Sequence, residues 1–321
     1  MKQVVEPGQL RLITRVARMY HEQKLRQPSI AEQLSLSQSR VSRLLKQASE
    51  LGIVRTVVSL PSGVYTDLED EVQQRYDLRD VAVVGVEGTV LDVTNALGAA
   101  TADYLDATLK GGDTIGISSW SSTLISAVSA MRPKSEPVAD YVVQIMGGLG
   151  DPTVQSQATR LTGDLASLTG AEPSYMPTPG VLGSAELREA LVADRAVAAV
   201  MDRWKDITVS LSGIGSLAPS PLLAQSGNAL APEDQDELRD AGAVGDVCLR
   251  FFDAEGTHVS SSFDRRVVGA NPDQLKGIGR RIGVAGGREK FDAIRAALTG
   301  HWVNILITDV ETARHLVSQD G

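Results

Sequence analysis

Apolar residues near the N-terminus recur at helical spacing. Within residues 10–24 they fall at Leu10, Ile13, Val16, Ala17 and Tyr20, which predicts a helix. Ser29 then stands three residues before Glu32, the spacing of a capping box. The stretch SIAEQLSL, beginning at Ser29, is therefore expected to form a second, short helix.

A third amphipathic block follows Ser37, which is expected to cap a helix that ends before Gly52. Its apolar face consists of Val41, Leu44, Leu45 and Ala48. The alternating stretch IVRTVVSL, residues 53–60, predicts a strand before the PSG break. Three helices, with a tight turn between the last two and a strand after them, are typical of a winged helix-turn-helix, here over residues 1–58.

Small polar and cationic side chains occupy the start of the third predicted helix. In a helix-turn-helix this end enters the DNA major groove, where Gln can bind adenine and Arg can bind guanine or phosphate. The candidate DNA-binding residues are Ser37, Gln38, Ser39, Arg40, Ser42, Arg43 and Lys46. The alternative is a solvated, capped helix without a ligand.

The charge of the chain is distributed unevenly. The net charge is −9, from 31 basic and 40 acidic residues, which for one uniform body argues against binding nucleic acid. Residues 1–60, however, carry 10 Lys and Arg against 4 Asp and Glu, which leaves 21 basic and 36 acidic residues for the remainder. A basic head on an acidic body supports the expectation that double-stranded operator DNA is a partner.

Beyond the head, short apolar runs alternate with helical patterns. The runs are VAVVGV, DTIGIS, YVVQIMGG, ITVSLSGIG and NILITD. This alternation predicts a doubly wound, mostly parallel α/β domain over residues 59–321. An acidic amphipathic helix is expected over residues 64–77, with three roles open: a linker, a dimerisation helix, or packing against the domain core.

Ligands of open α/β sheets bind outside the carboxyl ends of the strands. Four predicted strand ends are followed by small or glycine-rich loops, SSWSST, GGLG, SLA and GGREK, whose hydroxyls and backbone N–H groups suit a sugar or sugar phosphate. Glycine after a strand is also the ordinary turn residue, so each loop alone is weak evidence. The candidate effector-binding residues are Ser118, Ser119, Trp120, Ser121, Ser122, Thr123, Gly147, Gly148, Asp246 and Lys290.

Asp246 and Trp120 have two interpretations each, whereas Asp309 and Cys248 have one. Asp246 is expected near a strand end, where it binds sugar hydroxyls or serves a turn. Asp309, also near a strand end, is interpreted as the cap of the last helix, and Trp120 lines the pocket or packs beside it. The only cysteine, Cys248, is expected to be buried and fits a reducing cytoplasm.

Several kinds of site and location are not expected. The four histidines show no metal-ligand spacing, and no stretch matches GxxxxGK[ST], so we expect neither a metal nor a cofactor. No apolar run is long enough for a membrane span, and the N-terminus lacks a signal-peptide core. A cytoplasmic protein without a membrane partner is expected.

Taken together, these motifs resemble those of the SorC-type sugar-operon regulators, which include the central glycolytic gene regulator and the deoxyribonucleoside regulator. The resemblance covers nearly the whole chain and rests on SQSRVSRLLKQASELGIVR, GISSWSSTL, QIMGG, GAVGDVCLRFFD, IGVAGGREKFDAIRAAL and VNILITDVETA. It implies a DNA-binding head, an effector domain related to sugar-phosphate isomerases and assembly as a homo-oligomer, usually a tetramer. It also implies that the candidate effector residues form the effector pocket.

One position departs from the family pattern. The family commonly has Ser-Trp-Gly-x-Thr in the first loop, whereas this chain has an extra Ser and places Ser121 where glycine is usual. A Cβ there can block a close approach of phosphate to the backbone, which argues against a phosphorylated effector and leaves an unphosphorylated sugar or polyol open.

Two functions from different classes remain. The first is a transcriptional regulator of a carbohydrate catabolic operon controlled by a sugar, polyol or sugar-phosphate effector. The second is an isomerase-like enzyme with an accessory nucleic-acid-binding head, since a fold alone does not fix a function. The loops contain no convincing acid–base pair, and a basic head has no evident purpose in a metabolic enzyme, so the regulator is the preferred interpretation.

Overall fold

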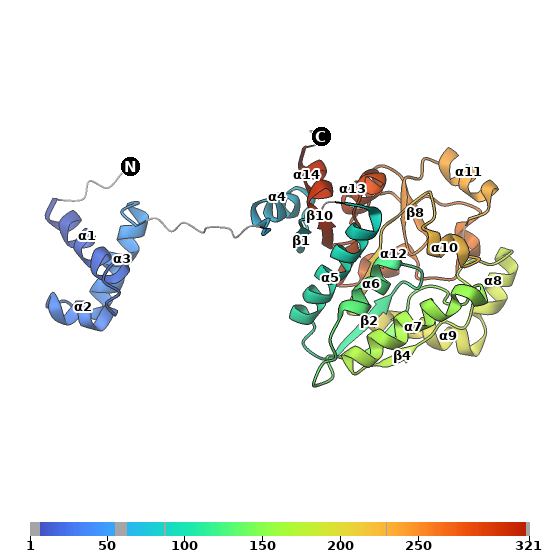
Figure 1. Ribbon diagram of the computed structural model, residues 1–321, viewed down its shortest axis with the longest axis horizontal. Coiled ribbons are helices and arrows are strands. Elements are labelled where there is room, and N and C mark those ends of the chain that lie inside the picture. Colours follow the sequence, from blue (N-terminus) through green and yellow to red (C-terminus); the bar gives the residue numbers. More distant parts are fainter. Residues whose placement is uncertain (1–6, 55–62, 87, 229, 319–321) are drawn as a thin grey trace. The chain divides into compact units, whose positions relative to one another are not determined.

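The computed structural model describes residues 7–54, 63–86, 88–228 and 230–318 (Figure 1). The chain divides into two compact units, Met1–Leu60 and Pro61–Gly321, and each is described by itself. Among the described helices, none combines the length and the apolar character that crossing a membrane requires.

The first unit is built from three helices around one small core. The helices are α1 (Pro7–His21), α2 (Gln27–Gln33) and α3 (Gln38–Glu50). The buried apolar side chains come from all three and are Ile13, Val16, Ala17, Met19, Ile30, Ala31, Val41, Leu44 and Ala48. The predicted apolar face of the third helix is thus its packing face, with Leu45 partly buried beside it.

One of the two predicted helix starts agrees with the structure, and the other needs a correction. Ser37 Oγ accepts the N–H of Arg40, which confirms it as the cap of α3. The prediction that Ser29 caps the second helix was wrong, because α2 begins at Gln27 with Arg26 at the N-cap position. Pro28 explains the difference, since its fixed φ and missing N–H suit the first turn of a helix.

A tight turn joins α2 to α3, and a glycine ends α3. Ser35 has a φ of 51°, a left-handed conformation in which the N–H of Leu36 reaches the carbonyl of Ala31. Gly52, with a φ of 69°, ends α3 in the same way, as predicted. The predicted wing strand stays a prediction, because Ile53 and Val54 form no strand and residues 55–60 lie outside the described part of the chain.

The second unit contains a seven-stranded sheet in the order β1-β10-β9-β5-β2-β3-β4, and all its strand pairs are parallel. These strands are β1 (Asp80–Val84), β2 (Asp113–Ile117), β3 (Ala139–Gln144), β4 (Glu172–Ser174), β5 (Val209–Gly213), β9 (Arg280–Val284) and β10 (Ile305–Asp309). The predicted parallel α/β architecture is confirmed. A second, antiparallel sheet consists of β6 (Gly215–Ser216), β7 (Gly245–Val247) and β8 (Arg250–Phe252).

Helices cover both faces of the parallel sheet (Figure 1). One core lies between the sheet and α5 (Val90–Thr108), α6 (Ser122–Ala130) and α7 (Pro152–Thr169). The other core includes side chains of α4 (Thr66–Tyr76), α9 (Arg195–Asp202), α13 (Phe291–Thr299) and α14 (Val310–Ser318). Neighbouring residues of one strand serve opposite cores, since Ile305 and Ile307 belong to the first and Leu306 to the second.

The remaining helical segments are short. They are α8 (Ala185–Val192), η1 (Arg203–Asp206), α10 (Pro221–Gln225), α11 (Pro232–Asp240), η2 (Asp264–Arg266), α12 (Pro272–Gly277) and η3 (Arg288–Lys290).

The helix expected over residues 64–77 is α4, and it packs against the body. Val72 is fully buried. Arg75 Nη1 donates to the carbonyl of Val317 at 2.7 Å, and the Tyr76 hydroxyl donates to the carbonyl of Leu316 at 3.2 Å. These two bonds satisfy carbonyls at the end of α14 that have no partner within the helix. Of the three roles left open for this helix, packing against the domain core is confirmed.

Candidate effector site and DNA-binding helix

The order of the parallel strands reverses between β2 and β5. From β2 the chain proceeds outward to β3 and β4, while β5, β9 and β10 lie on its other side. Ligands of open α/β sheets bind at such a switch point, at the carboxyl ends of the strands. The loops after β2, β5 and β9 are the ones that meet here.

Direct contacts bring these loops together. The N–H of Ser118 donates to the carbonyl of Leu211 on β5 at 3.2 Å. Ser121 Oγ lies 3.3 Å from the position that a Cβ would take on Gly213, the last residue of β5. Gly213 in turn pairs with Val284 of β9. Loops separated by almost a hundred residues are therefore neighbours.

The serine loop after β2 offers one hydroxyl for a ligand and uses another for its own helix. Ser119 is fully buried, and its Oγ has no hydrogen-bond partner among the described residues, a feature that calls for an explanation in a folded protein. Ser121 Oγ accepts the N–H of Leu124 and so caps α6. Ser122 is exposed and Thr123 partly buried in the first turn of that helix.

Trp120 packs rather than standing open in a pocket. Its side chain is buried, and its Nε1 donates to the carbonyl of Gly147 at 3.1 Å. A Cβ on Gly150 would lie 2.7 Å from the indole ring. Trp120 therefore connects the loop after β2 to the loop after β3 by packing, and its contact with an effector stays a prediction.

The glycine pair after β3 has a structural reason of its own. A Cβ on Gly147 would lie 2.2 Å from backbone atoms of Pro179 and Gly180. A Cβ on Gly148 would lie 2.2 Å from Gln144 Oε1. The clash at Gly147 is with backbone atoms, so protein contacts already require glycine there, whereas a side chain at Gly148 would require the end of the Gln144 side chain to move. A contact of the pair with an effector stays a prediction.

Asp246 lies in a different sheet from the one expected. It is the central residue of β7 in the small antiparallel sheet, and not at the end of a parallel strand. Its partner in β6 is Gly215, two residues beyond the end of β5, and Asp246 Oδ1 lies 2.0 Å from the position of a Cβ on that glycine. The pairing of β6 with β7 thus carries the carboxylate to the end of β5.

The turn role of Asp246 and its predicted binding of sugar hydroxyls involve different oxygens of the carboxylate. Oδ2 accepts the N–H of Leu249 at 2.8 Å, within the turn between β7 and β8. Cys248 and Leu249 form this turn with φ values of 55° and 62°, as in a two-residue hairpin of type I′. Oδ1 points to Gly215. The turn role of Asp246 is therefore confirmed, while binding of sugar hydroxyls stays a prediction.

Burial changes the titration of Asp246 and Lys290 in opposite directions. Burial raises the pKa of Asp246 to about 6, although the N–H of Leu249 and the charge of Lys290 oppose the rise. Burial also lowers the pKa of Lys290, against the charges of Glu289 and Asp246. Each group acts on the titration of the other, so the carboxylate of Asp246 and the ammonium of Lys290 lie near one another. Such perturbed pairs are enriched at functional sites.

The loop that carries Lys290 is fixed to α14. Gly287 N–H donates to Asp309 Oδ2 at 2.8 Å, and the N–H of Lys290 donates to the carbonyl of Gly287 at 3.0 Å. Asp309 Oδ1 accepts the N–H groups of Glu311 and Thr312 at 2.9 Å, so the predicted helix-capping role of Asp309 is confirmed. Lys290 is held in place through this capped helix.

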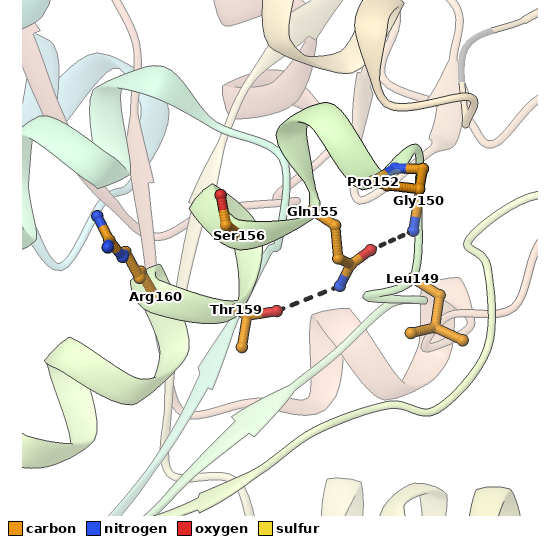
Figure 2. A pocket seen from close by; sticks show the side chains of 7 residues that line it. All are labelled: Leu149, Gly150, Pro152, Gln155, Ser156, Thr159 and Arg160. Carbon is orange, nitrogen blue, oxygen red and sulfur yellow. Dashed lines mark hydrogen bonds between the residues drawn. The ribbon is translucent and has the colours of Figure 1, made fainter.

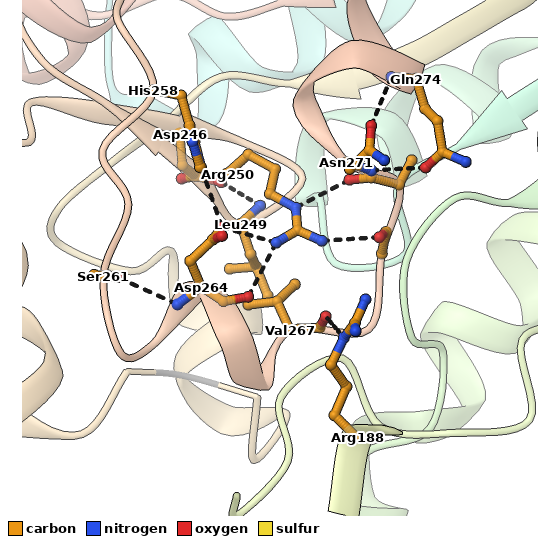
Figure 3. A network of polar contacts seen from close by, with 12 residues as sticks. Arg188, Asp246, Leu249, Arg250, His258, Ser261, Asp264, Val267, Asn271 and Gln274 are labelled. Carbon is orange, nitrogen blue, oxygen red and sulfur yellow. Dashed lines mark hydrogen bonds and ion pairs between the residues drawn. The ribbon is translucent and has the colours of Figure 1, made fainter. Parts of the chain in front are cut away.

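Sequence reasoning did not identify Arg250, which organises the hairpin beside Asp246 (Figure 3). Its guanidinium is buried and donates to the carbonyls of Gly269 and Ala270 at 2.9 and 3.0 Å and to Asp264 Oδ1 at 2.8 Å. Burial alone would raise the pKa of Asp264, but the contacts with His258 and Arg250 outweigh burial and lower it. The available signal was a single Arg within the apolar run VCLRFF.

A second feature that sequence reasoning missed is an open depression of about 580 Å³ beside the loop after β3 (Figure 2). Gln155 Nε2 donates to the carbonyl of Gly148 at 2.9 Å and to Thr159 Oγ1 at 3.2 Å, while the N–H of Gly150 donates to Gln155 Oε1. The lining residues are Leu149, Gly150, Pro152, Gln155, Ser156, Thr159 and Arg160. The glycine loop followed by a proline at a helix start could have indicated it.

In the first unit, α3 presents its predicted DNA-binding residues to solvent. Ser37, Gln38, Ser39, Arg40, Ser42, Arg43 and Lys46 are all exposed. Ser37 Oγ and Ser39 Oγ lie 3.1 Å apart, and Arg43 Nε donates to the carbonyl of Ser39 at 3.4 Å. Lys46 Nζ lies 3.8 Å from Glu50 Oε1. An exposed, basic second helix of a helix-turn-helix can bind the major groove, and binding of DNA by these residues stays a prediction.

Comparison with known proteins supports both parts of this description. Residues 63–318 match the family described as "Putative sugar-binding domain". The chain is 33% identical to the deoxyribonucleoside regulator of Bacillus subtilis over 303 residues, which cover 94% of this chain and 96% of that protein. It is 28% identical to the erythritol catabolism regulatory protein of Brucella abortus, covering 96% of each chain.

A solved structure extends the likeness to the whole chain. The full-length sorbitol operon regulator SorC of Klebsiella pneumoniae superposes with a TM-score of 0.72 at 28% identity, covering 97% of this chain and 99% of that one. These relatives are named as regulators, which supports the regulator over the isomerase-like alternative. The chain therefore belongs to the SorC family of transcriptional regulators with a sugar-binding domain.

Proposed function

We propose that this regulator binds operator DNA through α3 and is controlled by a carbohydrate bound at the switch point between β2 and β5. In this proposal residues 1–58 are the DNA-binding domain, and residues 59–321 bind the effector and form a homo-oligomer, a tetramer as the family resemblance implies. The protein acts in the cytoplasm, where operator DNA is accessible.

The observation that carries the effector site is the mutual influence of the Asp246 and Lys290 charges near the end of β5, where the loop with Ser119 also lies. A carboxylate accepts hydrogen bonds from sugar hydroxyls, and an ammonium group donates to sugar oxygens or to an anion. Asp246 and Ser119 are buried, Lys290 is partly buried, and all three residues come from elements that meet beside the end of β5. This arrangement suits a small polyhydroxylated ligand.

The names of the relatives indicate the class of effector to test first. One is a deoxyribonucleoside regulator, one a sorbitol operon regulator and one an erythritol catabolism regulator. Sugars, polyols and their phosphates are therefore the proposed effector class, controlling an operon for the catabolism of a carbohydrate.

Two measurements test the proposal together. Fluorescence anisotropy with labelled DNA from upstream of the protein's own operon measures operator binding, with a random-sequence duplex as the control. A thermal-shift screen over sugars, polyols and their phosphates identifies the effector, because a ligand at 100 times its Kd stabilises the folded state by about 2.7 kcal/mol. The proposal predicts that a stabilising compound also changes the anisotropy titration.

Variants then locate the site. Asp246→Ala and Lys290→Ala should weaken binding of the compound that the screen identifies, while Lys276→Ala, a control lysine packed over the Trp302 ring, should bind it normally. Wild-type affinity in both site variants would mean that the effector binds elsewhere.

A further inference from the structure

The exposed arginines of α3 lie on different sides of the helix. The packing side is defined by Val41, Leu44 and Ala48, which are buried. At 3.6 residues per turn, Ser39 and Lys46 lie nearly opposite the centre of that side. By the same geometry Arg40 lies only about 75° from it, and Arg43 about 130°. Arg40 therefore lies on the flank of the helix, away from the face that a groove-bound helix turns to the bases.

The flank with Arg40 forms one wall of a hollow of about 480 Å³, whose other wall is the start of α1. The lining residues are Gly8, Gln9, Leu12, Arg40, Arg43, Leu44 and Gln47. Two arginines line this hollow, and none of its lining residues is acidic. A hollow with this charge suits an anion that accepts hydrogen bonds, and Arg recognises phosphate by two parallel N–H donors.

Arg43 differs from Arg40 because its side chain is fixed along the helix. Its Nε donates to the carbonyl of Ser39 at 3.4 Å, which directs the guanidinium toward the start of α3. That end of a second helix is the part that contacts base edges in helix-turn-helix complexes. Arg43 can thus line the hollow with its aliphatic part and still reach the groove with its terminal nitrogens.

We propose that Arg40 binds a backbone phosphate of the DNA in the hollow between α1 and α3, whereas Arg43 contacts base edges. Arg40 is then a positioning residue that fixes the register of α3 on the duplex and carries no sequence information. The inference rests on the proposed DNA binding by α3 and assigns different tasks to two residues that the sequence pattern treats alike.

The test uses the full chain and two labelled duplexes, one from upstream of its own operon and one of random sequence, titrated at several salt concentrations. Arg40→Ala should weaken binding to both duplexes by a similar factor and reduce the slope of log K against log salt by about 0.9, as for one lost phosphate contact. Arg40→Lys should recover most of the affinity and the salt slope, since it retains the charge. Arg43→Ala should weaken binding to the upstream duplex by about 5- to 150-fold, as for a lost base contact, and change binding to the random duplex much less.

Arg18→Ala is the matched control, because Arg18 also belongs to the head but forms an ion pair with Glu22 and does not line the hollow. It should leave the ratio of the two affinities and the salt slope unchanged. The assignment is overturned if Arg40→Ala lowers affinity for the upstream duplex alone, or leaves the salt slope at the wild-type value. If the wild-type chain binds neither duplex, the proposed function fails and this inference fails with it.

Discussion

At the scale of single residues, burial decides how Asp246 responds to pH. Its pKa of about 6 lies above the ordinary value, so between about pH 4 and pH 6 the folded state keeps a proton that the unfolded chain has released. The free energy of unfolding therefore falls as pH rises through this window, and the loss is complete above pH 6. Two pKa units correspond to about 3 kcal/mol.

Asp246→Asn should remove this cost, because the amide stays neutral while its oxygen can still accept the N–H of Leu249. Relative to the wild type, the variant should gain up to about 3 kcal/mol of unfolding free energy between pH 4 and pH 7. Urea unfolding at several pH values measures the difference. Asp264→Asn is the matched control, because the pKa of Asp264 is lowered and its ionised form stabilises the folded state. That variant should be less stable than the wild type at neutral pH, and the difference should shrink as pH falls. Parallel stability curves for wild type and Asp246→Asn would contradict the prediction.

Lys290 distinguishes the two classes of effector. For a phosphorylated effector, Lys290→Ala removes a charge-assisted hydrogen bond of about 1.5–3 kcal/mol, a loss of at least about tenfold in affinity. Ser121 stands where the family commonly has glycine, so we expect a neutral sugar or polyol and a loss below tenfold. Isothermal titration of wild type and variant with the compound from the thermal-shift screen measures the ratio. A larger loss would identify an anionic effector.

At the scale of elements, the ends of α3 depend on single capping residues. Gly52 follows the end of α3 with a φ of 69°, and no atom lies within 4 Å of the position of an added Cβ. Gly52→Ala should therefore destabilise the end of α3 by about 1–2 kcal/mol through backbone strain alone, without a steric clash.

Hydrogen exchange of α3 amides in the full chain measures this effect. Gly277→Ala is the control, because it too has open space around an added Cβ but does not have a left-handed φ, and it should leave exchange near α12 unchanged or slower. Unchanged exchange in α3 of the Gly52 variant would show that backbone strain does not limit this helix.

At the scale of the whole molecule, the chain separates a small basic unit from a larger acidic one. A single small DNA-binding module buries only about 600–1,000 Å² of surface against DNA, which is modest for specific binding. An oligomer that tethers several heads gains affinity without new base contacts.

Residues 1–60 alone should therefore bind the upstream duplex at least about tenfold more weakly than the full chain. Anisotropy titrations compare the two, sedimentation establishes the oligomeric state of the full chain, and circular dichroism establishes that the fragment is helical. Equal affinities of a helical fragment and the full chain, or a monomeric full chain, would contradict the proposed role of oligomerisation.

The sequence by itself determined the features that depend on local contacts. Helical periodicity located α1 and α3, the Ser37 cap and Gly52 marked the ends of α3, and alternating apolar runs located the main parallel strands. It also indicated the family, because several motifs along the chain resemble those of the family. The start of α2 was misplaced because Ser29 and Pro28 are competing local signals, and the structure places the proline in the first turn.

Only the tertiary structure decided which distant residues meet. The pairing of β6 with β7 brings Asp246 to the end of β5, and the neighbouring positions of β9 and β10 bring Asp309 to the Lys290 loop. Neither contact can be obtained from spacing along the chain, because strand order depends on the packing of the whole sheet. The same holds for Gly147, because the nearby backbone of Pro179 explains why this position has no side chain. Residue type indicated the chemistry available, and only close packing between distant segments decided which groups were used internally.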